Sequence, residues 1–341
     1  MSEEWPIAAP ADPLVVPVRP VARDRLATVR RDFFLDPAAR LSEQERALMT
    51  AMLDDLVSTL ADEIIAALPN GLDAIGEDGH DALIARLSRA GLLDRPALVA
   101  LLLRRADEQR IGIALRPRGA AARAQLIQRW IADTDGDIAA AAMALVLARG
   151  RRRDRFGQGR LMFDDLPAEE AVVLVQQIAA ALRSPLPDHP AIDRALAQGA
   201  QTLLARHDEG ERIDSRVATL VRLLDGTGRI DDMLIEEAAQ QGEFGLLSAL
   251  LAHRAHVPEP TVWDHLVAGG EGRFVLLARL AGLGRSSAAR LVADLAPLAG
   301  IADAADELAR FDRIGDEAVE DARGEWRLPP AYAAARTLFR G

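Results

Sequence analysis

Three histidines are the first residues in this chain whose type and spacing could do chemistry. His253, His256 and His265 lie close together, and imidazoles three residues apart can share one face of a helix. A catalytic zinc ion takes three such ligands and a water molecule. The HExxH pattern is absent, and Pro258 and Pro260 interrupt the stretch. Surface or capping histidines without a metal are therefore our leading interpretation, and a metal-dependent hydrolase at this cluster is a second alternative function.

The stretch LLDGTGRIDDMLIEEA, residues 223–238, resembles a calcium-binding loop of the EF-hand type. With Gly228 at position 6 of such a loop, Asp225 falls at position 3. However, Leu223 and Leu234 then fall at positions 1 and 12, where the cation needs carboxylates. The pattern therefore does not predict a calcium site.

A junction between two helices explains the same residues. Gly226 and Gly228 are suited to end one helix, and Asp231 is suited to cap the next. Ile230 before the cap and Ile235 after it are placed as a hydrophobic staple.

An arginine-rich segment is the strongest candidate for binding. Six arginines stand against one aspartate between residues 149 and 160, with Phe156 among them: Arg149, Arg151, Arg152, Arg153, Arg155 and Arg160. Arginines beside an aromatic ring can hold phosphate and stack a base. They can equally pair with an acidic protein surface, such as the acidic stretch of this chain after Ile301. A solvated loop between two domains, pairing within or between chains, and nucleic-acid binding all stay open for this segment.

Several kinds of catalysis are excluded by composition. The chain has no cysteine, and all 41 of its Lys and Arg residues are arginine. Thiolate chemistry, Cys-bearing zinc sites, the P-loop and Schiff-base cofactors are therefore absent. GxSxG and dinucleotide-binding patterns are missing too, and the adjacent carboxylates of 54–55 and 164–165 point apart. We expect no enzyme, no catalytic residue and no cofactor, although a hydrolase assembled from distant residues stays open.

The charge and hydropathy of the chain indicate its cellular location. A formal net charge of −11 argues against a protein that coats nucleic acid or an anionic membrane. The N-terminus opens with MSEEWP, which does not read as a signal peptide. The longest apolar run, residues 138–148, is too short to cross a bilayer. We expect a cytoplasmic protein without a membrane partner.

Helical signals run along almost the whole chain. Ala and Leu dominate, and only 4% of residues are aromatic. Ser42 and Glu45 form a capping box ahead of a long helix whose apolar residues recur every fourth position. Asp94 can cap a helix with Pro96 in its first turn. The aspartates of DTDGD, residues 133–137, can cap the apolar run 138–148.

The organisation expected from these signals has two helical halves. Five prolines mark residues 1–20 as an extended arm. We predict an N-terminal helical domain over 21–150, an Arg/Gly-rich linker over 151–166, and a C-terminal helical-repeat domain over 167–341.

An internal similarity supports the repeat. AAQQGEFGLLSALL, starting at Ala238, can be laid over AGGEGRFVLLARLA, starting at Ala268, so that Gly242 matches Gly272 and Phe244 matches Phe274. A period of 30 residues fits a helical hairpin that buries one face on its neighbour. The fold class predicted is all-α, with HEAT-like helical hairpins stacked into a superhelix.

Longer stretches resemble a known family. Residues 153–183 (RDRFGQGRLMFDDLPAEEAVVLVQQIAAALR) and 228–266 are similar to the bacterial family known as domain of unknown function 2336, and FFLDPAARLSEQERALMTAMLDDLV resembles its N-terminal pattern. The resemblance implies an all-helical, HEAT-like body in a bacterial protein. It implies no activity, so no residue inherits a catalytic role.

The function expected is that of a non-catalytic scaffold or adaptor that binds another protein, in bacterial signalling or regulation. Stacked helix pairs create an extended surface suited to recognition, and the arginines of 149–160 would bind the acidic surface of the partner. The alternative is a helical-repeat protein that binds nucleic acid through the same arginines. The sequence identifies neither the partner nor the oligomeric state.

Overall fold

The computed structural model describes residues 41–69, 79–115, 125–155, 157–184, 189–267, 272–296 and 301–329, together with residues 332, 335, 336 and 339. The chain divides into two compact units, Met1–Ser42 and Glu43–Gly341. All the helices below belong to the second unit. The predicted arm of residues 1–20 lies outside the described residues.

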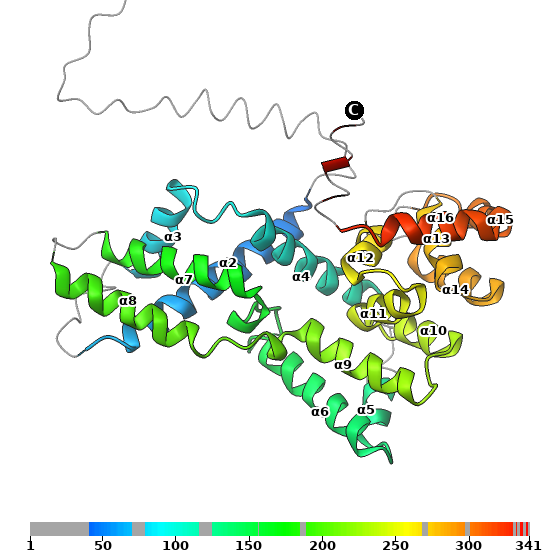
Figure 1. Ribbon diagram of the computed structural model, residues 1–341, viewed down its shortest axis with the longest axis horizontal. Helices are drawn as coiled ribbons and strands as arrows, with labels where there is room; N and C mark the ends of the chain where they lie inside the picture. The colour runs from blue at the N-terminus through cyan, green and yellow to red at the C-terminus, as the bar shows by residue number, and fades with distance from the viewer. Residues whose placement is uncertain are drawn as a thin grey trace, which may run out of the picture. The chain divides into compact units, whose positions relative to one another are not determined.

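The described part of the chain is all-α, as predicted (Figure 1). It contains no strand, and only one isolated antiparallel bridge, between Arg153 and Gly159. Two short 3-10 helices, η3 (Phe163–Asp165) and η4 (Glu209–Glu211), stand between the α-helices. The α-helices are α2 (Glu43–Ala66), α3 (Gly79–Arg89), α4 (Pro96–Leu115), α5 (Gln125–Ile131), α6 (Gly136–Arg151), α7 (Ala168–Arg183), α8 (Pro190–Leu204), α9 (Ile213–Gly226), α10 (Asp232–Gln240), α11 (Phe244–Ala255), α12 (Glu259–Val267), α13 (Arg273–Leu280), α14 (Arg285–Leu295), α15 (Ala304–Arg313) and α16 (Asp316–Trp326).

Aspartate caps begin several of these helices, and the sequence predicts two of them. Asp135 accepts hydrogen bonds from the backbone N–H groups of Asp137 and Ile138 at the start of α6. Asp231 accepts one from Leu234 at 2.8 Å at the start of α10. Each cap satisfies backbone donors that the first turn of a helix leaves unpaired. The stretch 223–238 is therefore a helix junction, as predicted.

Helix α6 is longer than predicted. The sequence suggests that the helix ends at residue 148 because Gly150 follows, yet α6 continues to Arg151. Arg149 and Arg151 occupy its last turn, where cations interact favourably with the carboxyl end of the helix dipole. The arginine-rich segment therefore begins on a helix and continues into a turn.

Two hydrophobic cores hold the helices together. One core is built from α2, α3, most of α4, α7 and α8, which Figure 1 shows packed side by side. The other is built from the last turns of α4 with α5, α6 and the helices from α9 to α16. Within α4, Leu98 and Leu102 belong to the first core and Ile111 to the second.

These cores combine helices from both sides of the segment 151–166. Helices α7 and α8 follow the segment in sequence but pack with α2 and α3, which precede it. Leu161 and Leu166 within the segment are buried in the same core. The division into domains 21–150 and 167–341 stays a prediction, but the buried surfaces do not follow it.

The internal similarity corresponds to similar local structure. Gly242 follows α10 and Gly272 follows α12, and the backbone has a positive φ at both, 70° and 80°. Phe244 is the first residue of α11 and Phe274 the second residue of α13, and both are buried. The two copies therefore share a glycine with positive φ and a buried phenylalanine two residues later, whereas the stacking of HEAT-like repeats stays a prediction.

None of the helices in the described ranges has the length and hydropathy required to cross a bilayer.

Candidate functional site

A cleft of about 450 Å³ is lined by four separate parts of the chain and by Met52 of α2. Its walls come from the second half of α4, the end of α6 with the turn that follows, the first residues of α9, and the turn between α10 and α11. Five arginines line it: Arg105, Arg149, Arg152, Arg153 and Arg160. Three carboxylates line it as well: Glu108, Asp214 and Glu243. Arginines therefore outnumber carboxylates by two among the lining residues, while Asp55 and Asp165, which pair with Arg160 and Arg152, lie outside the lining.

Arg105 forms a buried part of this lining. Its guanidinium donates to Glu108 at 2.7 Å and to Asp214 at 2.8 Å. Burial lowers the pKa of Arg105, but the two carboxylates outweigh it, so the pKa is raised and the side chain stays charged. Burial by itself would raise the pKa of Asp214, but the charges of Arg105 and Arg104 outweigh it and lower the pKa below its usual value. Arg105 therefore fixes one wall of the cleft.

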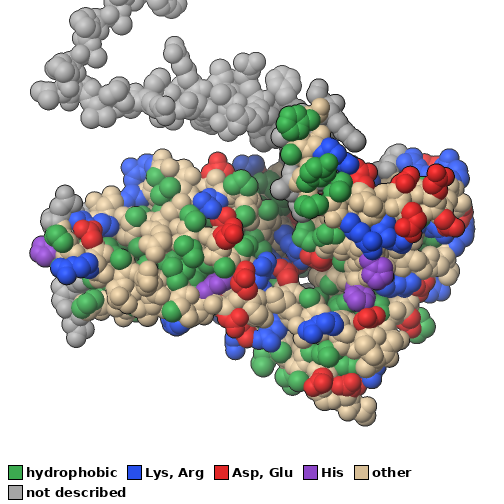
Figure 2. All heavy atoms as spheres, viewed as in Figure 1, with side chains coloured by type: hydrophobic (Ala, Val, Ile, Leu, Met, Phe, Trp, Pro, Cys, Tyr) green, Lys and Arg blue, Asp and Glu red, His purple; other side chains and the backbone are tan. Residues whose placement is uncertain are grey.

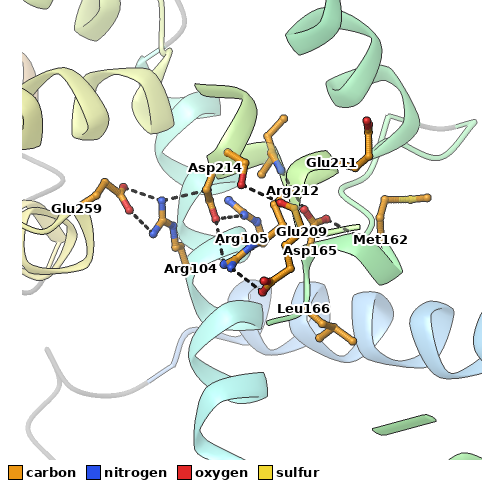
Figure 3. Close-up of polar contacts among 12 residues, drawn as sticks. Arg104, Arg105, Met162, Asp165, Leu166, Glu209, Glu211, Arg212, Asp214 and Glu259 are labelled. Carbon is orange, nitrogen blue, oxygen red and sulfur yellow. Dashed lines mark hydrogen bonds and ion pairs between the residues drawn. The ribbon is translucent and has the colours of Figure 1, made fainter. Parts of the chain in front are cut away.

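The neighbouring Arg104 joins three helices to α4 (Figure 3). It donates to both oxygens of Glu259 at 2.6 Å, and to Asp214 at 3.2 Å. The hydroxyl of Ser248 on α11 donates to the same Glu259 at 2.7 Å. The guanidinium also lies 4.9 Å from the ring centre of Trp263, in a cation–π contact. Helices α9, α11 and α12 are held against α4 by one polar network.

Of the six arginines predicted to bind a partner, four line the cleft: Arg149, Arg152, Arg153 and Arg160. Arg149 pairs with Glu243 at 2.6 Å, and Arg160 donates to both oxygens of Asp55 at 2.8 and 2.9 Å. These two pairs are half-buried. Arg151 and Arg155 do not line the cleft, and Phe156 lies outside the described residues.

Arg152 has a structural role. It donates to both oxygens of the fully buried Asp165, at 2.7–3.0 Å, and to the carbonyl oxygens of Ala148 and Glu211. Asp165 also accepts from the backbone N–H of Ile213 at 3.2 Å. This pair fixes α6 and the start of α9 together, so we do not assign Arg152 to partner binding.

The turn after α6 is held against α4 by an amide side chain. Gln109 accepts from the backbone N–H of Gly159 at 2.9 Å and donates to Gln158 at 3.2 Å. A Cβ at residue 159 would lie 2.5 Å from the Gln109 oxygen, so only glycine allows this approach. The turn that carries Arg153 and Arg160 therefore has a defined position on the cleft wall.

The structure uses the three histidines in different ways. His253 pairs with Asp225 at 3.1 Å, and His256 takes the left-handed conformation that ends α11. His265 stacks on Trp326, with ring centres 3.5 Å apart. Burial, and then the charge of Arg273, lower the pKa of His265 to about 4. No three His, Asp or Glu side chains in the described ranges are arranged to hold a metal ion.

Sequence reasoning missed Arg104, Arg105, Asp214 and Glu259. A signal was present, because the charges of RRADE, residues 104–108, interrupt a strongly apolar helix. Charged residues within a buried face need partners, and Glu108 is one for Arg105, but Asp214 and Glu259 lie 109 to 155 positions further along the chain. No local pattern identifies those partners.

Comparison with known proteins identifies a family but no characterised relative. Residues 82–322 match the family described as "Uncharacterised protein conserved in bacteria (DUF2336)", in agreement with the resemblance read from the sequence. No curated protein and no solved structure matches the chain. The match spans well over half of the 341 residues and includes every wall of the cleft except Met52. The chain belongs to the DUF2336 family of uncharacterised bacterial proteins.

Proposed function

We propose that this protein is a non-catalytic scaffold of the bacterial cytoplasm that binds another protein by taking an acidic segment of it into the arginine-lined cleft. The observation that carries the proposal is the set of five arginines that line one cleft of a strongly acidic chain. Guanidinium groups that are partly exposed in a cleft favour carboxylates over other peptide side chains.

Four of the five arginines of the cleft divide into two groups by their exposure. Arg105 and Arg152 are 8% and 11% exposed and hold the walls in place. Arg149 and Arg160 are 29% and 34% exposed, and each pairs with one carboxylate of the chain. A partly exposed ion pair contributes at most about 1 kcal/mol to stability. An incoming carboxylate can therefore replace Glu243 or Asp55 as the partner of the arginine at little cost in free energy. Arg149 and Arg160 are therefore the residues proposed to bind the partner.

Nucleic-acid binding is the alternative proposal for the same residues. An excess of two arginines over carboxylates in the lining is small for a surface that must neutralise several phosphates. The same cleft and the same arginines would also give this activity a strong dependence on salt, which makes the two functions separable by experiment.

The test uses the full chain and labelled probes. We expect a fluorescent peptide rich in Glu to bind, and a peptide of the same length rich in Lys not to bind. Arg149→Glu and Arg160→Glu should each weaken binding of the acidic peptide by about tenfold or more, the equivalent of about 1.4 kcal/mol. Arg285→Glu is the matched control, because Arg285 is exposed, pairs with Asp312, and lies outside the cleft.

Two results would overturn the assignment. One is binding of the acidic peptide that Arg149→Glu and Arg160→Glu leave unchanged, or no binding at all. The other is tighter binding of a single-stranded oligonucleotide with a steep loss of affinity as salt rises, which would favour the nucleic-acid alternative.

A further inference from the structure

Helix α6 carries three large hydrophobic side chains that the other described residues cover only in part. Met143, Val146 and Leu147 are large hydrophobic side chains that are 43%, 39% and 56% exposed. The opposite face of the helix is buried against α5 and α9. Figure 2 shows hydrophobic side chains at the surface in the lower part of the view, where Figure 1 places α5 and α6. Apolar side chains grouped in this way are typical of an interface.

A neighbouring stripe of α6, which shares Leu147 with this group, has opposite charges at its two ends. Asp137, Ala140, Ala144, Leu147 and Arg151 follow one another at spacings of three and four residues, so they lie along one stripe. No charged residue occurs between Asp137 and Arg149. Asp137 is exposed, and Arg151 is 66% exposed with its nearest carboxylate, Glu211, 3.9 Å away. The stripe is therefore negative at one end, apolar in the middle and positive at the other end.

We propose that this stripe pairs with the same stripe of a second copy of the chain, with the two α6 helices antiparallel. Positions 137 and 151 are equally far from 144 in sequence. A two-fold axis through Ala144 therefore brings Asp137 of each copy opposite Arg151 of the other, which gives two equivalent ion pairs. The antiparallel arrangement also aligns the helix dipoles favourably. A surface that is complementary to itself is the requirement for a two-fold dimer.

The residues between the charges suit a close approach. Ala140 and Ala144 are small, so two helices can pack near each other there, while Leu147 and Met143 supply apolar surface beside them. A helix of 16 residues is about 24 Å long, and one such contact buries less than the roughly 1,200 Å² that stable interfaces reach. The dimer is therefore weak and depends on protein concentration.

The proposal does not depend on the cleft. Asp137, Ala144 and Arg151 do not line it, so the failure of one proposal leaves the other intact.

Cross-linking through a single cysteine tests the axis directly. The chain has no cysteine, so Ala144→Cys introduces its only thiol. A disulfide requires Cβ atoms about 3.5–4.5 Å apart, which residue 144 meets only close to a two-fold axis. We expect a disulfide-linked dimer of Ala144→Cys under mild oxidation, formed much faster than with the control Met233→Cys. Met233 is 74% exposed and lies on α10. Equal rates of cross-linking for the two variants would overturn the proposal.

Charge reversal tests the register independently, in the cysteine-free chain. Asp137→Arg places arginine against arginine, and Arg151→Asp places aspartate against aspartate, so each should weaken the dimer by about tenfold in sedimentation experiments. The double variant restores both contacts with their signs exchanged, and we expect dimerisation to return. An interface worth about 4 kcal/mol has a dissociation constant of about 1 mM, so half of the chains would be dimeric at that concentration. A chain that stays fully monomeric up to about 1 mM therefore overturns the proposal. So does a double variant that associates no better than the single ones.

Discussion

Buried arginines in this protein depend on a small number of carboxylates. Asp214 accepts hydrogen bonds from both Arg104 and Arg105, at 3.2 and 2.8 Å, and is enclosed with them. A buried charge that loses its partner is strongly destabilising, because it can neither return to water nor be neutralised. At the residue scale, Asp214 is therefore the carboxylate on which the wall of the cleft depends most.

Substitution of Asp214 tests this dependence. We expect Asp214→Ala to lower the free energy of unfolding by about 1.5–3 kcal/mol, because Arg104 and Arg105 each lose a charge-assisted hydrogen bond but keep Glu259 and Glu108 as partners. The matched control is Asp312→Ala, which removes the partner of the exposed Arg285 and should change stability by less than about 1 kcal/mol. Urea unfolding followed by circular dichroism measures both. Equal losses of stability in the two variants would show that the network around Asp214 adds little to the free energy of unfolding.

His265 predicts a dependence of stability on pH. Its folded pKa is lowered from 6.5 to about 4 by burial and by Arg273, and its buried Nδ1 has no hydrogen-bond partner among the described residues. The unfolded chain therefore binds this proton more readily than the folded chain. The contribution of His265 is complete above pH 6.5 and is lost as the pH falls from 6.5 towards 4.

We expect His265→Phe, which keeps an aromatic ring against Trp326, to remove this dependence. Between about pH 7.5 and pH 5 the wild-type protein should lose about 1–2 kcal/mol more than the variant. Unfolding in urea at the two pH values gives the difference. Parallel losses in the two proteins would contradict the lowered pKa of His265.

At the scale of the element, the repeated turns at Gly242 and Gly272 have the clearest physical requirement. Both glycines have a φ that is strongly unfavourable for residues with a Cβ. The residue that follows each turn leads into a helix whose leucines are buried, including Leu247 and Leu277. A change at either turn therefore alters how a helix enters the core.

Alanine substitutions test the two turns together. Gly242→Ala and Gly272→Ala should each destabilise the protein by about 1–2 kcal/mol, because of backbone strain. Space is not the cause at residue 272, where the nearest atom to an added Cβ lies 3.8 Å away. Gly324→Ala, inside α16 and in open space, should instead stabilise the protein by about 0.5–1 kcal/mol. Thermal unfolding compares the three variants, and similar effects at all three positions would argue against the strained turns.

At the scale of the whole molecule, the two hydrophobic cores are joined by α4. This helix contributes to both cores, and the Arg104 and Arg105 network fastens it to α9 and α12. We therefore expect the cores to unfold together. The tryptophans allow a test, because Trp130, Trp263 and Trp326 all pack in the core of α9 to α16.

The test is a cavity in the other core. Leu60 on α2 is fully buried there, and Leu60→Ala should cost about 2–5 kcal/mol. In a Trp5→Phe background, which removes the tryptophan outside the described residues, we expect this substitution to shift the tryptophan fluorescence transition and the circular dichroism transition equally. A fluorescence transition that Leu60→Ala leaves in place would show that the cores unfold separately.

Local features of the fold were predictable to the extent that their causes are local. A cap such as Asp135 or Asp231 acts on the next three residues, and the start of α4 at Pro96 follows from the fixed φ of proline. The end of α6 was predicted too early, because Gly150 weakens a helix but does not end it when the following turn is held by tertiary contacts.

By itself, the amino-acid sequence determined that the described part of this protein is all-α and where several of its helix junctions lie, because helix periodicity and capping act over a few residues. The resemblance of longer stretches indicated its family. Only the tertiary structure decided what the arginines do. It assigned Arg152 to a buried contact with Asp165, and it brought Arg105 together with Asp214 from far along the chain. It also left the apolar stripe of α6 exposed. The partners of buried charges and the exposure of helix faces depend on how distant helices pack, and no local pattern encodes that.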